Sequence, residues 1–436
     1  MQARAPEALF VMPREFRPVR SELAQDPLQE RVAEVVEESA LSLLDARQVQ
    51  AMAEDLGVVK LRRVHHVGLL VSSLVLSALE RQSDTSGRWL DAQDVYKQLG
   101  GPRASKTSFR IRTRQSVPLL QKMLDRRMKK LAEETDDFEL RGRLAAFSNV
   151  LIPDGCAFKL ASVLAGYFPG TGNPAELKLH AVYCVKTGMV DVSQSAGRVH
   201  DNDGFAPTAW EKGALYIWDL GYNDTDRFVD AALAEAIALQ RLKRGANPVV
   251  LAWYDAQGCR HAIAHDDGKP MRLQDASQLD AVAYGAFDLD VELRDNKARR
   301  VVARVVCVPY EGEDRYYLTM LPRDIFTPFD VAELYRIRWE VELFFRNWHG
   351  TLRMDDVHRL RHPVSVQAHV LASLLAATLA RDIHAGLSRI SAQYAEDQAA
   401  RNASPSPDSV GAFPPSAPVT GQQQRYRSAR LAAHRS

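Results

Sequence analysis

The period of hydrophobic and polar positions changes twice along the chain. Between about residues 20 and 135 apolar residues recur at helical spacing, and the apolar run from Val67 to Glu80 predicts a buried helix. From Phe147 to Met320 the pattern changes to the short alternating runs that are typical of strands. Helical spacing then returns in two segments, Phe329 to Leu352 and Ser365 to Leu387. The pattern predicts an α/β protein with a β-rich centre.

The helical N-terminal part contains a candidate helix-turn-helix. A helix from Asp91 to Leu99 is followed by Gly100-Gly101-Pro102 and by a second helix that begins at Ser105. This second helix is predicted to continue to about Lys130, and it is strongly basic. We expect it to contact DNA, and a solvated charged surface is the alternative. The arginines nearest its start are Arg110, Arg112 and Arg114.

The β-rich centre begins with three consecutive predicted strands, Asn149 to Leu160, Leu177 to Lys186 and Met189 to Ser195. A fourth strand, Ala214 to Trp218, is followed by a helix from about Thr225 to Lys243. Five more strands are predicted further on, at Val249 to Tyr254, His261 to Ala264, Ala281 to Leu293, Val301 to Val308 and Tyr316 to Met320. The first strand contains Asp154, and Asp219 directly follows the fourth.

A polar stripe on an otherwise apolar helix is the sharpest chemical signal. Tyr335, Arg338, Glu342 and His349 are separated by three, four and seven residues. At about 3.6 residues per turn they fall within an arc of roughly 60°. A solvated helix face is one interpretation. The other is a site for a metal ion and a polyanion, because a Tyr, an Arg and a Glu interrupt a largely aromatic helix.

Together, three segments resemble bacterial insertion-sequence transposases of the DDE class. The first is Asn149-Val150-Leu151-Ile152-Pro153-Asp154-Gly155, the second is Trp218-Asp219-Leu220-Gly221-Tyr222, and the third is Tyr335-x-x-Arg338-x-x-x-Glu342. The last is similar to the Y-R-E-K signature of that family, with His349 at the Lys position. The resemblance covers roughly residues 145 to 385.

The resemblance implies an RNase H-like catalytic core with a β-rich insertion between the second Asp and the Glu, plus an all-helical N-terminal DNA-binding region. The implied boundaries are 1–140 for the helical DNA-binding region, 145–248 and 323–390 for the two parts of the core, 249–322 for the insertion, and 391–436 for a disordered tail. The Ser-, Pro- and Gln-rich composition beyond Ser391 favours that tail independently.

The resemblance also implies a chemistry, in which Asp154, Asp219 and Glu342 hold two Mg²⁺ ions, with Mn²⁺ as a substitute. Carboxylates suit this task because Mg²⁺ prefers hard oxygen ligands. Asp219 would bridge both ions. The implied activity is cleavage at transposon ends and strand transfer into target DNA. The implied partner is double-stranded DNA, bound by a homodimer.

Several further residues are candidates for DNA contact. Tyr335 and Arg338 share a helix face with Glu342, and an Arg fork suits phosphate. His349 would replace the family's Lys, although a His is only partly charged near neutral pH. Arg346 could supply that charge instead, which would leave His349 a bystander. Trp253 could stack on a base, with a core position as the alternative.

Composition permits this hypothesis without requiring it. Lys and Arg total 56 against 55 Asp and Glu, so the net charge of +1 does not by itself indicate a nucleic-acid partner. The four Cys show no paired spacing, and no apolar run in the sequence reaches the length of a membrane span. We expect a cytoplasmic protein without membrane contact. Two alternatives remain open: a catalytically decayed DNA-binding relic or regulator, and an RNase H-like nuclease without strand transfer.

Overall fold

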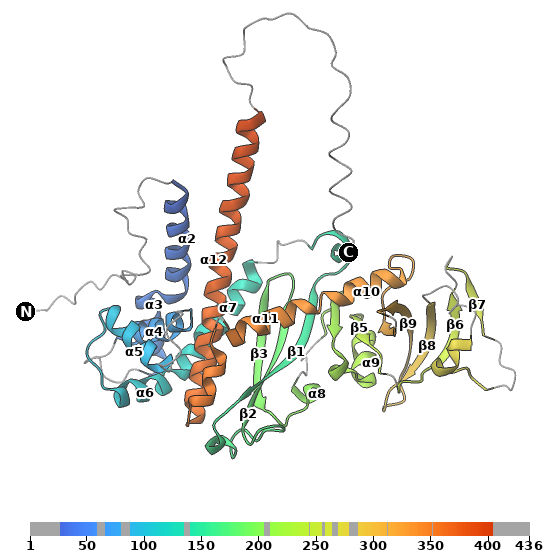
Figure 1. Ribbon diagram of the computed structural model, residues 1–436, viewed down its shortest axis with the longest axis horizontal. Helices are drawn as coiled ribbons and strands as arrows, with labels where there is room; N and C mark the ends of the chain where they lie inside the picture. Colours follow the sequence, from blue (N-terminus) through green and yellow to red (C-terminus); the bar gives the residue numbers. More distant parts are fainter. Residues whose placement is uncertain are drawn as a thin grey trace, which may run out of the picture. The chain divides into compact units, whose positions relative to one another are not determined.

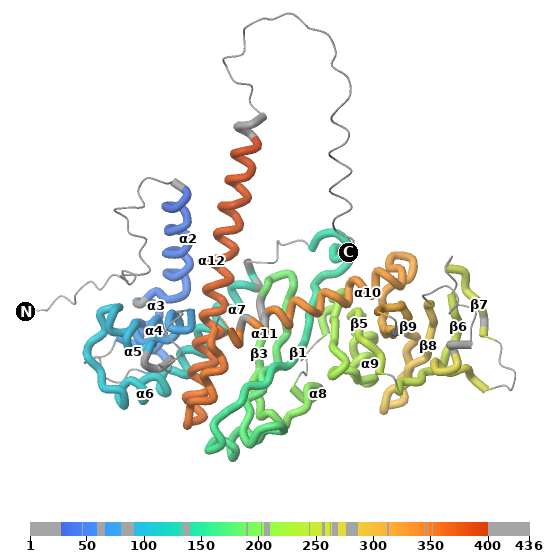
Figure 2. Tube along the Cα trace, viewed as in Figure 1, coloured from blue at the N-terminus to red at the C-terminus, as the bar shows by residue number. Residues whose placement is uncertain are grey.

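The computed structural model describes most of the chain (Figures 1 and 2). The described residues are 27–58, 66–79, 88–134, 140–204, 210–243, 245–254, 258–263, 269–278, 287–311, 313–350 and 352–403. Contacts divide the chain into two units, residues 1–386 and 387–436, and each is described by itself. All sites discussed below belong to the first unit.

The described N-terminal residues form α-helices, namely α2 (Pro27–Leu44), α3 (Ala46–Asp55), α4 (Val67–Leu79), α5 (Arg88–Gln98), α6 (Lys106–Gln115) and α7 (Val117–Glu134). The apolar helix predicted from Val67 is α4, and it is buried along nearly all of its length. The expectation of one basic helix from Ser105 to about Lys130 was wrong. Ser105 caps α6, but this helix ends at Ser116, and Pro118 then lies in the first turn of α7, where a missing backbone N–H is tolerated.

A single ten-stranded sheet forms the centre of the first unit. Its order is β3-β2-β1-β4-β5-β10-β9-β8-β6-β7. The strands are β1 (Val150–Lys159), β2 (Glu176–Cys184), β3 (Met189–Ala196), β4 (Leu215–Trp218), β5 (Ile237–Arg241), β6 (Val249–Tyr254), β7 (Arg260–Ala262), β8 (Phe287–Arg294), β9 (Arg300–Tyr310) and β10 (Glu313–Thr319). The first four predicted strands are confirmed as β1 to β4. Part of the predicted strand from Ala281 lies outside the described residues.

Two features of this sheet differ from expectation. The helix predicted from Thr225 to Lys243 ends early: α9 spans Thr225–Leu233, Glu235 adopts a positive φ of 58°, and the remainder forms β5. In addition, β10 pairs antiparallel with β5, so the strands between the second Asp and the Glu continue the central sheet. The edge that β5 offers explains this continuity, because an unpaired strand edge presents free backbone N–H and C=O groups.

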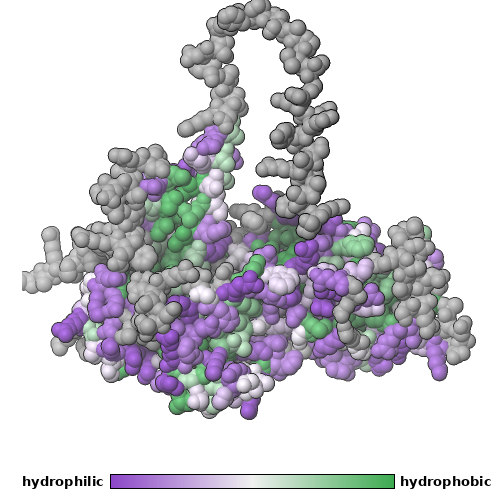
Figure 3. All heavy atoms as spheres, in the orientation of Figure 1, coloured by the Kyte–Doolittle hydropathy of each residue, from purple (hydrophilic) through white to green (hydrophobic). Residues whose placement is uncertain are grey.

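Helices cover both faces of the sheet. One hydrophobic cluster joins the N-terminal helices to the face that carries Ile152 and Phe158, and a second cluster fills the opposite face around Trp218 and Phe228 of α9. Ion pairs also tie the N-terminal helices to the rest of the unit, between Asp91 and Arg353 at 2.7 Å and between Arg127 and Asp382 at 2.5 Å. Hydrophilic side chains cover most of the described surface in the view of Figure 3.

The helix expected from Phe329 to Leu352 is two helices. These are α10 (Pro328–Arg336) and α11 (Trp339–Gly350), which follow one another across the sheet in Figure 1. Thr327 and Asp330 form a capping box at the start of α10. α10 contacts β5 and β9, whereas α11 contacts β1. The break at Ile337 and Arg338 lets each helix follow a different part of the twisted sheet.

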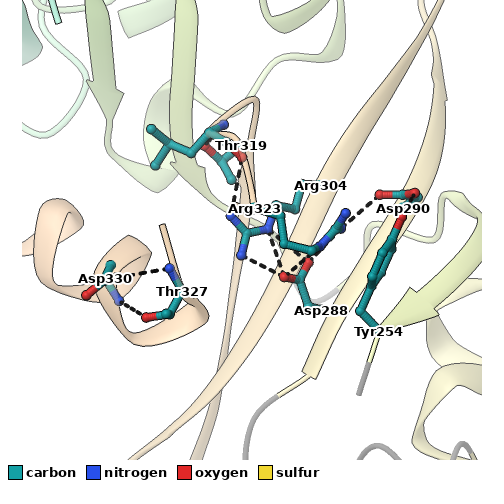
Figure 4. Close-up of polar contacts among 9 residues, drawn as sticks. Tyr254, Asp288, Asp290, Arg304, Thr319, Arg323, Thr327 and Asp330 are labelled. Atoms are coloured by element: carbon teal, nitrogen blue, oxygen red, sulfur yellow. Dashed lines mark hydrogen bonds and ion pairs between the residues drawn. The ribbon is translucent and has the colours of Figure 1, made fainter. Parts of the chain in front are cut away.

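A closed ion network fixes the segment that leads into α10 (Figure 4). Asp288 of β8 accepts hydrogen bonds from the guanidinium groups of Arg304 on β9 and of Arg323, at distances between 2.6 and 3.0 Å. Arg323 also donates to Asp290 at 2.8 Å and lies 3.4 Å from the ring centroid of Tyr254. We call Asp288, Asp290, Arg304 and Arg323 the strand network. The strand network connects the strands that were expected to form an insertion with the segment that precedes α10.

The last helix, α12, spans Pro363–Ala403. The tail expected to begin at residue 391 is therefore wrong at its start, since residues 391–403 are helical, and 404–436 lie outside the described residues. By length and composition, residues 363–399 could cross a membrane, but 72% of the most apolar window of this helix is buried within the protein, as in the core helix of a globular protein.

Candidate active site

The first two candidate carboxylates lie in register on neighbouring strands. β1 and β4 are parallel and pair Val150 with Leu215. Asp154 and Asp219 each lie four residues beyond that pair, so they reach the same end of the two strands. Asp154 is still within β1, whereas Asp219 follows β4 as the cap of a short 3-10 helix, η3 (Leu220–Tyr222). Two residues that are far apart in sequence thus lie close together.

Glu342 comes to the same place from the opposite layer. It lies in the first turn of α11, and the Nη2 atom of Arg338 donates to its Oε1 at 2.6 Å. The same guanidinium lies 3.8 Å from Asp154 Oδ2, measured from Nη1, and 3.7 Å from Asp219 Oδ1, measured from Nε. One cation therefore contacts all three carboxylates, although they come from three separate elements. We call these four residues the carboxylate site.

Tyr335 completes this arrangement from α10. Its hydroxyl donates to Asp219 Oδ1 at 3.4 Å, and its ring packs against Tyr317 of β10 with the centroids 5.1 Å apart. The ring is almost fully buried, and burial raises the pKa of its hydroxyl. Tyr335, Arg338 and Glu342 thus meet as their spacing predicted, even though the helix breaks between them.

Burial and charge change the acidity of Asp154. Burial raises the pKa of this carboxyl to about 6, an effect that the charges of Asp219 and Asp201 reinforce. The backbone N–H of Gly155, which donates to Asp154 Oδ1 at 2.7 Å, and the cation of Arg338 oppose the rise. The repulsive and desolvation contributions win, so the site holds more negative charge than its single arginine offsets.

The carboxylate oxygens of Asp154, Asp219 and Glu342 are the kind of ligand that a divalent cation such as Mg²⁺ prefers, and they already surround one positive charge. The guanidinium of Arg338 contacts each of the three carboxylates, at 3.8, 3.7 and 2.6 Å. Within the described parts of the chain, no three or more His, Cys, Asp and Glu side chains are gathered closely enough to hold a metal ion.

His349 does not contact these carboxylates. Its Nε2 lies 3.0 Å from the Cys156 sulfur, its Nδ1 lies 2.9 Å from Asp355 Oδ1, and its ring stacks on Phe158 at 4.7 Å between centroids. Cys156 and Phe158 belong to β1, so His349 ties α11 to the strand of Asp154. Burial raises the pKa of the Cys156 thiol to about 12, which keeps it protonated and excludes a thiolate nucleophile near neutral pH.

The remaining candidates for DNA contact lie elsewhere. Arg110 and Arg112 are exposed on α6, whereas Arg114 is half-buried and donates to the Ser365 hydroxyl at 2.9 Å. Trp253 is on β6, six strand positions from β1, which corresponds to roughly 30 Å. Its ring stacks on His261 with the centroids 4.1 Å apart. The structure does not bring Trp253 to the carboxylate site.

Asp201 and Lys178 were missed in the sequence, although they lie directly behind Asp154. Their side chains form an ion pair at 2.7 Å, and Asp201 is one of the charges that raise the pKa of Asp154. The segment Asp201-Asn202-Asp203-Gly204 has the composition of an ordinary turn. The weak signal that could have found the pair is a glycine just after each aspartate, with Gly155 next to Asp154 and Gly221 two residues after Asp219.

Comparison with known proteins agrees with this geometry. Residues 147–379, more than half of the chain, match the family described as Transposase DDE domain. The chain is also 41% identical over 66 residues to the putative transposase InsL for insertion sequence element IS186A of Escherichia coli K12 and to the transposase for insertion sequence element IS421 of Escherichia coli. Those matches cover 15% of this chain and only 18% of each relative. Asp154, Asp219 and Glu342 all lie within the matched range, and the chain belongs to the Transposase DDE domain family.

Proposed function

We propose that this protein is a DNA transposase that cuts DNA at the ends of an insertion sequence and joins the free 3′-hydroxyl to target DNA. The observation that carries the proposal is the contact of one guanidinium, that of Arg338, with three carboxylates from β1, β4 and α11. An ionisable group whose pKa is shifted by burial and by neighbouring charges, such as Asp154, is typical of a functional site. The family membership and the names of the two relatives support the same conclusion.

The carboxylate site would hold two Mg²⁺ ions, or Mn²⁺ in their place, through Asp154, Asp219 and Glu342. When bound, such a pair neutralises charge at the scissile phosphate and activates an oxygen nucleophile. Asp219 is the most exposed of the three carboxylates, at 41%, which suits the bridging role proposed for it. The buried Asp154 and the helical Glu342 would each complete one position.

Arg338 and Tyr335 would position the DNA beside these carboxylates. An Arg fork binds two phosphate oxygens at once, and Arg338 already lies at the centre of the site. The deeply buried Tyr335 would act mainly by holding Asp219, whose carboxylate accepts its hydrogen bond. His349 is the remaining candidate for phosphate contact. Its present partners make docking of α11 on β1 a second role for it.

For the rest of the chain we propose the organisation that the resemblance implies. The order β3-β2-β1-β4-β5, with β1, β4 and β5 parallel, fits an RNase H-like core. The strands β6 to β10 would be the family's insertion, joined here to the core through β5. The exposed Arg110 and Arg112 of α6 would bind the DNA ends, and the working form would be a cytoplasmic homodimer that bridges two ends. Arg114 would contribute less directly, and Trp253 could stack only on DNA that extends across the sheet.

A single substitution series tests the proposal. The substrate is a linear duplex that carries the DNA flanking the coding sequence. Asp154→Asn, Asp219→Asn and Glu342→Gln should each abolish Mg²⁺-dependent cleavage, while gel-shift binding of the same duplex persists. Glu340→Gln is the matched control, because Glu340 is exposed on the same turn of α11. Cleavage by the Glu342→Gln protein at the rate of the Glu340→Gln protein would refute the assignment.

The same assay separates the alternatives. A nuclease without strand transfer would cut the duplex but would not join its 3′ ends to a target plasmid. A decayed relic would bind the ends and do neither. The relic hypothesis draws on His349, since its two ring nitrogens contact Cys156 and Asp355.

A further inference from the structure

Asp201 and the side chain of Asp154 lie on opposite faces of the sheet. Asp201 lies against Gly155, the next residue of β1, and successive residues of a strand point to opposite faces. Asp154 points toward α11, together with Cys156 and Phe158, which contact His349. Gly155 faces the other way, toward α8 (Asp201–Gly204). This opposite face directly below Asp154 is used by no step of the proposed chemistry.

The carboxylate of Asp201 lies beside two glycines, and at Gly155 it occupies the space that a side chain would fill. A Cβ added to Gly155 would lie 2.6 Å from Asp201 Oδ1, and one added to Gly221 would lie 3.6 Å from Asp201 Oδ2. Gly155 directly follows Asp154, and Gly221 lies two residues after Asp219. A single carboxylate therefore fits between the two segments that carry the candidate catalytic aspartates.

Other contacts hold Asp201 in that position. Lys178 of β2 lies 2.7 Å from its Oδ1 and also donates to the Val199 carbonyl at 3.2 Å. The far end of α8 is fixed as well, because Gly204 lies so close to the His180 ring that any Cβ would overlap it. His180 is itself held by Ser195, whose hydroxyl oxygen lies 2.8 Å from its Nε2. Lys178 and Asp201 are half-buried, and the second contact of Lys178 with the Val199 carbonyl holds this pair more firmly than an isolated surface ion pair.

We propose that Asp201, held by Lys178, is a positioning residue that sets how Asp154 and Asp219 stand relative to each other. This inference rests on the proposed function, because it matters for catalysis only if those two carboxylates act together. The carboxylate acts as a spacer of fixed width between Gly155 and Gly221. The Lys178 ammonium pairs with this carboxylate and holds it in place, while the charge of Asp201 still contributes to the raised pKa of Asp154. No direct contact with DNA or with a metal ion is assigned to Asp201.

Shortening the spacer tests the idea. Asp201→Ala should slow single-turnover cleavage by about 100-fold, because a shift of roughly 1 Å in catalytic groups costs that much. The Mn²⁺ concentration for half-maximal cleavage should also rise, by about tenfold, as it does when outer-shell support is lost. End binding and the thermal midpoint should stay near those of Asp203→Ala. Asp203 is the matched control because it is exposed on the same short helix.

A substitution at Gly155, the residue that Asp201 lies against, gives a second, independent measurement. Gly155→Ala should slow cleavage in the wild-type background, since its Cβ would displace the Asp201 carboxylate. In the Asp201→Ala background the same substitution should cost much less, because the group it displaces is gone. Such non-additivity is expected for residues that act through one contact. If Asp201→Ala leaves too little folded protein, Asp201→Leu combined with Lys178→Met removes both charges and keeps the volume.

The outcomes separate this inference from the proposed function. Equal cleavage rates and Mn²⁺ dependence for Asp201→Ala and Asp203→Ala would overturn the positioning role. So would parallel losses of end binding and thermal stability, which mark a purely structural residue. If Asp154→Asn still cleaves, the proposed function itself fails. If Asp154→Asn is inactive and Asp201→Ala behaves like Asp203→Ala, only the positioning role fails.

Discussion

Two clusters of acids and arginines lie in the same unit and differ in how well their charges match. In the strand network, Asp288 and Asp290 meet Arg304 and Arg323, with two carboxylates for two guanidinium groups and contacts of 2.6 to 3.0 Å. In the carboxylate site, three carboxylates share the guanidinium of Arg338, and two of the three distances are 3.7 and 3.8 Å.

From this difference we infer that the strand network serves the fold, and that the carboxylate site serves the proposed function. Asp288 and Arg304 are almost fully buried, and both oxygens of Asp288 accept hydrogen bonds, so the network is complete without any further ion. The carboxylate site leaves Arg338 Nε buried with no hydrogen-bond partner among the described residues, and it raises the pKa of Asp154. An incomplete, negatively charged cluster is suited to bind positive charge.

The largest expected contrast between the clusters is in catalysis. On the proposed function, Asp219→Asn should reduce DNA cleavage by about a thousandfold or more, because it removes a carboxylate that would hold the metal ions at the reacting phosphate. Asp290→Asn removes a carboxylate of the strand network and should leave cleavage within about tenfold of wild type, since its partners are structural. Single-turnover cleavage of the flanking-DNA duplex measures both. Similar losses in the two variants would remove the distinction.

The next contrast is in stability. Asp288→Asn should lower the free energy of unfolding by about 3 to 5 kcal/mol, because it leaves buried guanidinium charge without its partner. Asp288→Leu combined with Arg304→Met should recover much of that loss, since apolar side chains of similar volume can replace a buried pair. Chemical denaturation reports both values. An Asp288→Asn protein as stable as wild type would show that the network is not a closed structural unit.

The smallest expected contrast is in DNA binding. It compares the exposed Arg110 and Arg112 with Arg114, which already forms a hydrogen bond within the protein. Arg110→Gln and Arg112→Gln should each reduce the slope of log affinity against log salt by about 0.9. With one phosphate contact fewer, binding releases fewer counterions from the DNA. Arg114→Gln should change the slope less, because Arg114 already donates to Ser365. Fluorescence anisotropy with labelled end DNA at several salt concentrations measures the slopes. An unchanged slope in the double variant of Arg110 and Arg112 would place end recognition outside α6.

Sequence reasoning found those parts of the site that depend on local spacing. The register of Asp154 and Asp219 follows from two parallel strands, and the three- and four-residue spacing brings Tyr335, Arg338 and Glu342 to one side. The interruption between α10 and α11 at Ile337 and Arg338 was not predicted. The apolar spacing continues through these residues, and no Pro or Gly marks the end of a helix there.

Contacts made only by the tertiary fold could not be predicted. Asp201 lies beside Gly155 although the two are 46 residues apart, and no sequence pattern predicts that contact. Likewise, β10 pairs with β5 because the edge of β5 was free to accept a strand. The partners of His349 have the same origin, since Cys156 and Asp355 come from β1 and from a segment after α11. The family resemblance, together with the spacing of the Glu342 helix, thus located the catalytic candidates, and the residues that support them appeared only in the structure.

The central claim is that the carboxylate site holds excess negative charge at the expense of stability. The folded-state pKa of Asp154, about 6, lies above its ordinary value of 3.8. Between those values the native state takes up a proton that the unfolded chain does not, so stability falls as pH rises through this window. Above about pH 6 the full cost is present, and below about pH 4 it is absent.

The most direct test is the free energy of unfolding of Asp154→Asn against wild type at pH 7 in the presence of a chelator. The account predicts that the variant is more stable, by about 2 kcal/mol, as often follows when a functional charge is removed from a buried site. The gain should disappear near pH 4. An Asp154→Asn protein less stable than wild type at pH 7, as expected for Asp288→Asn, would contradict the account.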